Sequence, residues 1–371
     1  MVNGVRMTGG KKGLAVSAAA VLVLGWLAGA PAGAEGAGVL KSCWAPEALA
    51  GRPDEKRARF TREQTPIPAV SLPAATPSSI LGTVRRVKLP PGRKLVALTF
   101  DLCEAGLEIA GYDGGVIDYL RAQDVKATLF VGGKWMVHHP ERAAQLMSDP
   151  LFEIGTHGWA HANLHVTTGQ GVDDEIGGGI AAFDVTRRAL AERSCARRAP
   201  ADLARIPAAP KLFRFPFGTC TPEALSVVAR EGQLAIQWDV VTGDPDRHIT
   251  PEAIARTVLA QSRPGSIIVA HANGRGLRTA EALPLFVPQM RARGFEFVTV
   301  GELLAAGTPE VAPTCYERRP GDNTRYDVLA RLRRDHQPRQ PQPRSAAPAR
   351  GDARPAEKAA PPAAWPIDSD R

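Results

Sequence analysis

The sequence holds 371 residues, of which 44% are hydrophobic and 23% are charged, and its formal net charge is +8. Because this much apolar material can build a sizeable core, the composition excludes a chain that is disordered over most of its length. Much of the positive excess lies in the N-terminal leader and in the Arg-rich C-terminal tail, so the charge says little about the central region. We expect no nucleic-acid partner.

The N-terminus has the features of a secretory signal peptide, which we place at residues 1–34. Basic residues precede an apolar run over residues 14–27, and Ala32-Gly33-Ala34 supplies the small residues that precede a cleavage site. The apolar run is shorter than the about 20 residues needed to cross a bilayer. We therefore predict a secreted or periplasmic protein with no integral membrane span after signal removal, in a compartment where disulfide bonds persist.

A single catalytic domain is expected at residues 93–307. Residues 35–92 are rich in Pro, Ala and basic residues, which favours an N-terminal extension wrapped on the core, without a domain of its own. We assign residues 308–333 to a C-terminal extension. The Pro-, Ala- and Arg-rich tail at residues 334–371 has the composition of a disordered segment.

Within the expected domain, apolar runs of strand length alternate with helical patterns. The predicted strands are 95–100, 127–131, 152–155, 212–215, 234–238, 267–270 and 295–300. The predicted helices are 115–122, 140–147, 173–192, 222–230, 251–261 and 280–293. This alternation indicates parallel β-α units, and hence an α/β fold in which the sheet is covered by helices or closed into a barrel.

Side chains of catalytic type lie at the ends of several predicted strands. Chemistry gathers at the carboxyl ends of parallel strands in such folds, and the residues found there are Asp101, His157, Arg214, Asp239, Asp244 and His271. Their recurrence predicts one shared site. His157 and His161 are four residues apart, a spacing that puts both imidazoles on one side of a helical turn, where they can hold one divalent cation.

Five motifs in series resemble those of the polysaccharide deacetylases of carbohydrate esterase family four, which includes chitin, chitooligosaccharide and peptidoglycan deacetylases. In chain order they are Thr99-Phe100-Asp101, residues 157–164, residues 214–218, Trp238-Asp239 with Asp244, and residues 268–271. The resemblance covers about residues 94–307. It implies a distorted (β/α) barrel, here of about seven parallel strands, and metal-dependent hydrolysis of acetyl groups from sugars.

The resemblance also implies roles for the acids and bases. Asp101 would be the general base, and Arg214 would keep it ionised and oriented. His271 would be the general acid that protonates the leaving nitrogen. Asp244 fits the family spacing as the partner of His271, and Asp239 is the alternative.

The implied cofactor is a divalent metal, expected to be Zn²⁺, held by His157 and His161. The backbone N–H of Phe217 could complete the oxyanion hole with the metal. In addition, Asn273 or Arg275 could contact a sugar, although the polar segment that contains them is equally typical of a plain turn.

One departure from the family pattern leaves the third metal ligand open. The usual first motif has two successive aspartates, but Leu102 occupies the second position and cannot bind a metal. The third ligand would then be Asp101, Cys103, Glu104, His165 or a water molecule. We favour Glu104, because Cys103 is a candidate for a disulfide bond and His165 is expected to be solvated.

The chain has five cysteines, so one is left over from any complete pairing. Cys103 and Cys220 follow strands that end at the same face, which favours a bond between them. Cys43 and Cys315 flank the core in sequence and could join the two extensions. Cys195 would then be free.

The predicted function is a secreted metal-dependent deacetylase of N-acetylated or O-acetylated cell-envelope polysaccharide or oligosaccharide. One alternative is a non-catalytic glycan-binding or envelope-assembly protein that lost metal binding through Leu102. The other is a metal amidase that acts on a non-sugar amide. A base with its orienting arginine and an acid favour the enzyme, because binding alone needs none of them. The sequence does not indicate the oligomeric state.

Overall fold

The computed structural model describes residues 38–328 and residue 330. The expected signal peptide at residues 1–34 and the expected tail at residues 334–371 lie outside the described residues. Among the residues that are described, no helix is long and apolar enough to cross a membrane.

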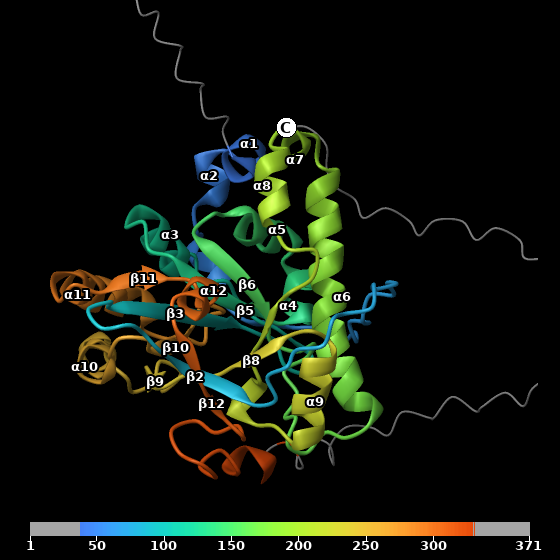
Figure 1. The fold of residues 1–371 in the computed structure, drawn as a ribbon. Helices are drawn as coiled ribbons and strands as arrows, with labels where there is room; N and C mark the ends of the chain where they lie inside the picture. The colour runs from blue at the N-terminus through green and yellow to red at the C-terminus, as the bar shows by residue number, and fades with distance from the viewer. Residues whose placement is uncertain (1–37, 329, 331–371) are drawn as a thin grey trace, which may run out of the picture.

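A curled, mostly parallel sheet forms the centre of the molecule (Figure 1). All seven predicted strands are present, as β3 (Leu95–Leu102), β5 (Ala127–Val131), β6 (Phe152–Thr156), β7 (Leu212–Phe213), β8 (Leu234–Ile236), β10 (Ile267–His271) and β11 (Glu296–Val298). β8 pairs with β7, whereas β9 (Val240–Val241), a few residues further along the chain, pairs with β10. The sheet therefore curls into a half-barrel, which confirms the expected distorted barrel.

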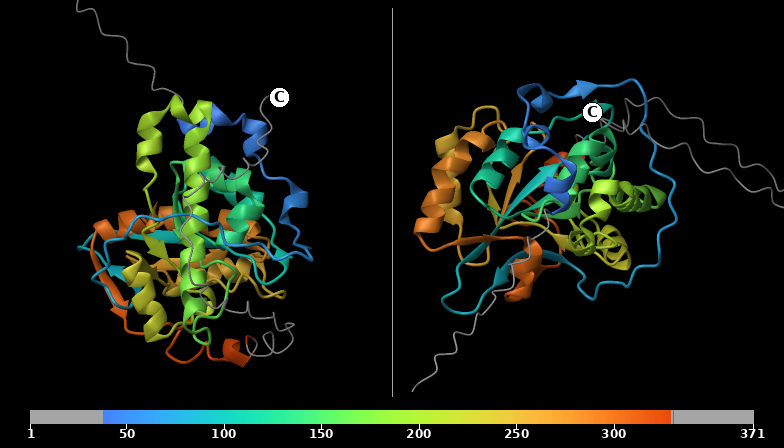
Figure 2. Two further views of the ribbon diagram at one scale, coloured as in Figure 1. Left: turned by 90° about the vertical axis from the view of Figure 1, so that its right-hand side faces the viewer. Right: turned by 90° about the horizontal axis from the view of Figure 1, so that it is seen from above.

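The six predicted helices lie around the strands, as Figure 2 shows from above. They are α3 (Gly114–Ala122), α5 (Pro140–Ser148), α6 (Gln170–Glu192), α9 (Pro222–Arg230), α10 (Pro251–Gln261) and α11 (Thr279–Ala292). Thr221 and Thr250 cap α9 and α10, because each hydroxyl accepts a hydrogen bond from a backbone N–H in the first turn, at 3.1 and 3.2 Å. The shorter helices were not predicted; they are α4 (Gly133–His138), α7 (Ser194–Arg197), α8 (Pro200–Arg205) and α12 (Val300–Ala305).

Part of the expected N-terminal extension belongs to the sheet. β2 (Thr83–Lys88) pairs in parallel with β8 and antiparallel with β12 (Thr308–Ala312), at the start of the expected C-terminal extension. Before β2 the chain forms α1 (Val39–Cys43), α2 (Pro46–Leu49), η1 (Pro53–Lys56) and β1 (Arg59–Phe60), which pairs with β4 (Glu108–Ile109). Between β1 and β2 the chain runs around the outside of the molecule without helix or strand (Figure 2).

β3 shows how a strand places a polar group inside the barrel. Side chains alternate along a strand, and Leu98, Phe100 and Leu102 are fully buried in the core between the sheet and the helices. The intervening residues face the interior, and Asp101 is the last of them within the strand. Burying a side chain such as Leu or Phe stabilises the fold by about 1.5–3 kcal/mol. The apolar face of β3 therefore fixes the register in which Asp101 points inward.

The disulfide pairing expected from the sequence is wrong. Cys43 is bonded to Cys195 and Cys220 to Cys315, which leaves Cys103 as the free, buried cysteine. Cys43 lies on α1, which packs against α7, so the N-terminal segment is joined to the helix layer. Cys220 and Cys315 belong to a separate hydrophobic cluster that includes residues of α9. Strand order alone therefore placed Cys103 and Cys220 too close together.

Candidate active site

The two histidines lie in a loop directly after β6, and the expected helical turn is wrong. Gly158 and His161 have positive φ values of 74° and 55°, so the chain bends at both residues instead of continuing as a helix. The bent loop still brings the imidazoles of His157 and His161 together, with ring centroids 5.1 Å apart. Glycine suits position 158 because it adopts positive φ without steric cost, and a Cβ there would come within 2.6 Å of a carboxylate oxygen of Glu175.

Glu175 on α6 holds this loop in place. Its carboxylate accepts hydrogen bonds from the backbone N–H groups of Ala160 at 3.0 Å and of Ala162 at 2.7 Å. Burial raises the pKa of Glu175, and these backbone donors oppose the rise. Sequence reasoning missed this residue because a glutamate inside a helical pattern is usually on the solvated face. Glu175 is thus a positioning residue for the loop that carries both histidines.

Asp101 and Arg214 form a buried ion pair inside the barrel. Nη1 of Arg214 donates a hydrogen bond to Oδ1 of Asp101 at 2.8 Å, and both side chains are almost fully buried. Arg214 also donates to the Thr99 hydroxyl and to two backbone carbonyls, and its guanidinium lies 3.9 Å from the centroid of the Phe130 ring. Breaking such a pair leaves an unpaired buried charge, at a cost of about 3–5 kcal/mol. The position of Asp101 is therefore tightly fixed.

The surroundings keep Asp101 ionised and His157 neutral. Burial would raise the pKa of the Asp101 carboxyl, but Arg214, together with His157 and His271, lowers it by more, so the pKa lies below its usual range. Burial lowers the pKa of His157, against the opposing effect of Asp101. The Nδ1–H of His157 donates to the Arg214 carbonyl at 2.8 Å. Its Nε2, 3.5 Å from Oδ2 of Asp101, therefore carries the lone pair that can bind a metal.

His271 and Asp244 form a second polar pair beside the first. His271 ends β10, in register with Asp101 on β3. The Nδ1–H of His271 donates to Oδ1 of Asp244 at 2.9 Å, and its backbone N–H donates to Oδ2 at 2.7 Å. The hydroxyl of Thr279 donates to Oδ2 of the same carboxylate at 2.6 Å. The orientation of the His271 ring is therefore set by a carboxylate that is itself fully hydrogen-bonded.

Asp239, the alternative partner of His271, lies elsewhere. Its carboxylate accepts hydrogen bonds from the backbone N–H of Ile267 at 2.9 Å and from the hydroxyl of Ser266 at 3.0 Å. These contacts fix the start of β10 and not its end. Asp244 is therefore the acid that partners His271 in the structure.

The charge on His271 is favoured by its neighbours. Burial lowers the pKa of its imidazolium, but the carboxylates of Asp244 and Asp101 together raise it by more. Arg275 opposes them. The net result is a pKa above the usual histidine value, so His271 can hold a proton that it later gives away.

Glu104, the favoured third metal ligand in the sequence analysis, is engaged away from the histidine pair. Its carboxylate accepts a hydrogen bond from the backbone N–H of Ala110 at 3.0 Å and pairs with His138. The expectation for Glu104 is therefore wrong. His165 has a side chain that is 44% exposed, and its Nδ1 pairs with Asp327 at 2.8 Å. His165 thus lies at the surface, as the sequence indicated.

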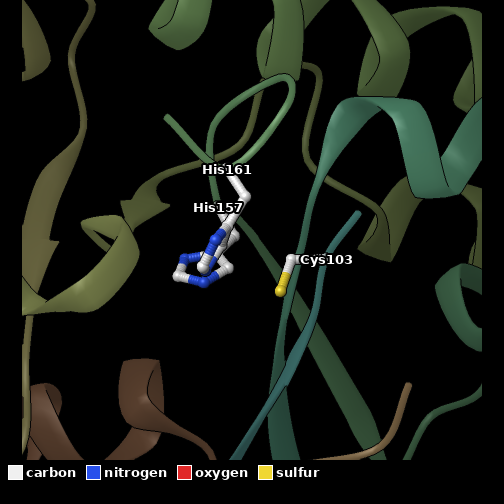
Figure 3. Close-up of side chains that lie close together, drawn as sticks. All are labelled: Cys103, His157 and His161. Atoms are coloured by element: carbon white, nitrogen blue, oxygen red, sulfur yellow. The ribbon is translucent and has the colours of Figure 1, made fainter. Parts of the chain in front are cut away.

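Cys103 is the residue that the structure brings to the two histidines (Figure 3). Its Sγ and one ring nitrogen each of His157 and His161 all lie within 4.8 Å of one another. Among the described residues, this is the one group of three or more His, Cys, Asp or Glu side chains close enough to share a metal ion. Burial raises the pKa of the Cys103 thiol far above its usual value. Two imidazole nitrogens and one sulfur form a donor set that fits Zn²⁺.

Aromatic side chains border the histidine loop. The Phe217 ring lies with its centroid 4.3 Å from that of His161 and 5.1 Å from that of Tyr326. Phe217 has a φ of 58°, so its backbone N–H belongs to a sharply bent turn. Tyr326 lies beyond the expected catalytic domain, in the segment that the Cys220–Cys315 disulfide ties down near this turn. Nothing in the local sequence pattern indicated that this segment reaches the site.

The turn after β10 is held by internal contacts. Nδ2 of the buried Asn273 donates a hydrogen bond to the Cys103 carbonyl at 2.7 Å. Arg275 pairs with Glu108. Asn273 is therefore a structural residue of the turn, and Arg275 is already paired at the surface.

The site thus combines three kinds of group at the carboxyl ends of β3, β6 and β10. They are a buried ionised carboxylate, an imidazole held by a second carboxylate, and a nitrogen and sulfur donor set. The carboxylate can accept a proton, the held imidazole can donate one, and the donor set can hold a cation that polarises a substrate.

Residues 88–235 match the family model described as polysaccharide deacetylase. The chain is 27% identical over 213 residues to a peptidoglycan-N-acetylglucosamine deacetylase of Bacillus cereus, and the alignment covers 57% of this chain and 68% of the relative. It is 28% identical over 203 residues to a chitooligosaccharide deacetylase of Bradyrhizobium sp., and that alignment covers 51% of this chain and 82% of the relative.

Solved structures with some similarity to the chain include both an enzyme and a pseudoenzyme. The Bc1960 peptidoglycan N-acetylglucosamine deacetylase is 25% identical with a TM-score of 0.46, and the match covers 60% of this chain and 93% of the other. BA3943 of Bacillus anthracis, a family-four pseudoenzyme, is 22% identical with a TM-score of 0.45, and the match covers 58% and 66% of the two chains.

Proposed function

This chain carries a polysaccharide deacetylase domain, and from that premise we propose that it is a metal-dependent hydrolase that removes acetyl groups from N-acetylated or O-acetylated cell-envelope polysaccharide. The observation that carries the proposal is the buried pair of Asp101 and Arg214, with His271 in register on the neighbouring strand. A protein that only binds glycan needs no ionised base, no group to orient it and no held acid. This arrangement therefore supports an enzyme over a binding protein.

Asp101 is the proposed general base. Its pKa lies below the usual range, so the carboxylate is ready to accept a proton from an attacking water molecule at neutral pH. The Arg214 hydrogen bond at Oδ1 leaves Oδ2 as the oxygen that faces Nε2 of His157. Arg214 is a positioning residue in this scheme, because it keeps Asp101 ionised and oriented without touching the substrate.

His271 is the proposed general acid. Its Nδ1–H is engaged by Asp244, so Nε2 of the imidazolium carries the proton that is free to leave. Transfer of that proton to the amide nitrogen, or to the ester oxygen of an O-acetyl group, lets the deacetylated sugar depart. Asp244 stabilises the charged form of His271 and fixes its ring.

His157 and His161 are the proposed metal ligands, and Zn²⁺ is the proposed metal. When bound, such a cation would polarise the acetyl carbonyl and make a water molecule more acidic. His157 is prepared for this role, because its Nδ1–H is fixed on the Arg214 carbonyl and its imidazole is neutral. The backbone N–H of Phe217 is the proposed protein donor to the oxyanion.

A secreted or periplasmic location is part of the proposal. The signal-like N-terminus and two disulfide bonds, Cys43–Cys195 and Cys220–Cys315, support it, because disulfides form and persist in oxidising compartments. An acetylated glycan of the cell envelope is a substrate that such a protein would meet.

The proposal is tested by measuring acetate release from N-acetylchitooligosaccharides, peptidoglycan, an O-acetylated glycan and a non-sugar N-acetyl amide. The proposal expects the zinc-loaded protein to release acetate from at least one glycan faster than from the amide. Release from the amide alone would support a metal amidase instead. No release from any of the substrates would support the non-catalytic glycan-binding alternative.

The pH profile should follow the raised pKa of His271. Its acid form is the active one, so kcat/KM should fall as the pH rises through the folded-state pKa, which lies above the ordinary value of about 6.5. In Asp244→Asn the largest effect that raises this pKa is removed, whereas Asp101 and Arg275 still face the ring. We expect the alkaline limb of the kcat/KM profile to shift to lower pH in this variant. An unchanged or upward-shifted limb would show that His271 is not the acid.

A further inference from the structure

We infer that Cys103 supplies a thiolate ligand to the metal, in a Cys-His-His set with His157 and His161. The inference rests on the proposed function, since it concerns the metal ion that the proposed reaction uses. It goes further because it assigns the third protein ligand to sulfur, where the resemblance to the family would lead one to expect a carboxylate.

The strand geometry explains why Cys103 takes this position. Leu102, which stands where the family motif has its second aspartate, is fully buried in the core on the helix side of β3. Because side chains alternate in an extended chain, residue 103 emerges on the same side as Asp101, toward the interior. The ligand position is therefore displaced by one residue along the chain, and the residue found there is a cysteine.

The distances support shared coordination. In a tetrahedral site with Zn–S of about 2.3 Å and Zn–N of about 2.0–2.1 Å, the ligand atoms are about 3.3–3.6 Å apart. The three ligand atoms of Cys103, His157 and His161 already lie within 4.8 Å of one another. Small rotations of these side chains cover the difference. Asp101 does not belong to this group, so it can serve as the base while the other three residues hold the metal.

The backbone around Cys103 is fixed from both sides. Its carbonyl accepts the hydrogen bond from Asn273, and the carbonyl of Leu102 accepts one from the backbone N–H of Gly132 at 2.8 Å. The next residue, Glu104, is anchored by Ala110. Asn273 and Glu104 therefore act as positioning residues for the thiol, a role that accounts for two buried polar side chains that the reaction itself does not use.

The other four cysteines are bonded to each other, so the Cys103 thiol is available to bind a metal ion. All five cysteines of the chain lie in the described part, and the other four are paired with each other. Cys103 therefore has no cysteine partner, although the other four are oxidised to disulfides. A zinc-type cation displaces the proton of a thiol that it coordinates. Sulfur also selects Zn²⁺ and similar metals over the oxygen-preferring Mg²⁺ and Ca²⁺.

Cobalt substitution tests the inference without reference to activity. The full-length protein is loaded with Co²⁺ and its absorption spectrum is recorded, because a thiolate bound to cobalt gives a charge-transfer band that imidazole and carboxylate ligands do not give. Cys103 is the only free thiol, so the band reports on it alone. We expect the band in the wild type and its loss in Cys103→Ser. Zinc affinity should also fall at least about 10-fold in that variant. Loss of a residue that only hydrogen-bonds to a metal ligand already lowers metal affinity by about 10–100-fold.

Two further variants test whether the band depends on sulfur and whether the loss of zinc affinity is specific to Cys103. Cys103→Asp offers an oxygen ligand in place of sulfur, so it should recover part of the zinc affinity without the band. His165 lies four residues after His161, but its ring pairs with Asp327. The His165→Ala variant should therefore keep both the cobalt charge-transfer band and the zinc affinity. Thermal unfolding of the metal-free proteins identifies any variant that has failed to fold.

The outcomes separate this inference from the proposed function. A cobalt-loaded wild type without the band, or a Cys103→Ser variant with unchanged zinc affinity, overturns the inference even if metal-dependent acetate release is observed. The band together with an absence of acetate release from every glycan supports the inference and contradicts the proposed function. A protein that binds neither Co²⁺ nor Zn²⁺ contradicts both.

Discussion

Asp101→Asn is expected to lower kcat for acetate release by about 10²–10⁴-fold, the usual contribution of a general base. Asparagine keeps the shape of the side chain and an oxygen that can accept the hydrogen bond from Arg214, but it cannot accept a proton from water. The metal content should not change, because Asp101 lies outside the group of metal-binding side chains. The measurement is kcat on the preferred glycan together with metal analysis of the same sample.

This variant needs a stability control, since it leaves the Arg214 charge buried without its partner. Such a loss costs about 3–5 kcal/mol, so thermal unfolding must show that the variant is folded at the assay temperature. Asp239→Asn is a matched control, because that carboxylate is also largely buried and hydrogen-bonded but fixes the start of β10. A folded Asp101→Asn protein with activity within about 10-fold of the wild type would contradict the role of Asp101 as base.

His157→Ala is expected to lose both the metal and acetate release. His157 is fully buried, and its Nε2 is the nitrogen that faces the site, so alanine removes one of the two proposed imidazole ligands. The loss of zinc affinity should exceed the about 10–100-fold that removal of an outer-shell partner costs. Isothermal titration with Zn²⁺ and an acetate assay measure the two effects separately.

The matched control for this second variant is His165→Ala. His165 lies in the same segment and continues the four-residue spacing, but its ring is at the surface beside Asp327. It should bind zinc and release acetate as the wild type does. Equal losses in both variants would point to general damage of the loop, and wild-type zinc affinity in His157→Ala would contradict the metal site.

The alternation of strands and helices, and the polar residues at the strand ends, follow from local patterns in the sequence, whereas the barrel was implied by the family resemblance. Runs such as 127–131 and 267–270 are short and almost wholly apolar, which is typical of buried strands in a sheet with covered faces. Once their order is known, the carboxyl-end rule brings Asp101 and His271 together, and they are indeed register partners on β3 and β10. The choice of Asp244 over Asp239 was confirmed by its contacts with His271.

Other features depend on contacts between distant segments, which no local pattern records. β2 carries the charged residues Arg85 and Arg86, so its sequence does not have the apolar pattern of a buried strand. In the structure, Arg85 donates hydrogen bonds to the carbonyls of Tyr316 and Glu317, which lie 231 and 232 residues later in the chain. The disulfide pairs likewise depend on which helices pack together, as α1 and α7 do.

The histidine loop shows the same limit at the site itself. A four-residue spacing predicts a helical turn, but positive φ at Gly158 and His161 replaces that turn with a loop held by Glu175. The expectation for Glu104 failed for a related reason. Glu104 is near Asp101 in sequence, but its carboxylate is bound to Ala110 and His138, and the residue that reaches the histidines is Cys103.

The central claim is that a metal held by this site removes acetyl groups from a glycan. The most direct measurement is acetate release from peptidoglycan and N-acetylchitooligosaccharides by one preparation in three states: as purified, after removal of metal with a chelator, and after addition of Zn²⁺. We predict release that disappears with the metal and returns with zinc. Release that is unaffected by removal of the metal, or absent in the zinc-loaded protein, would contradict the claim.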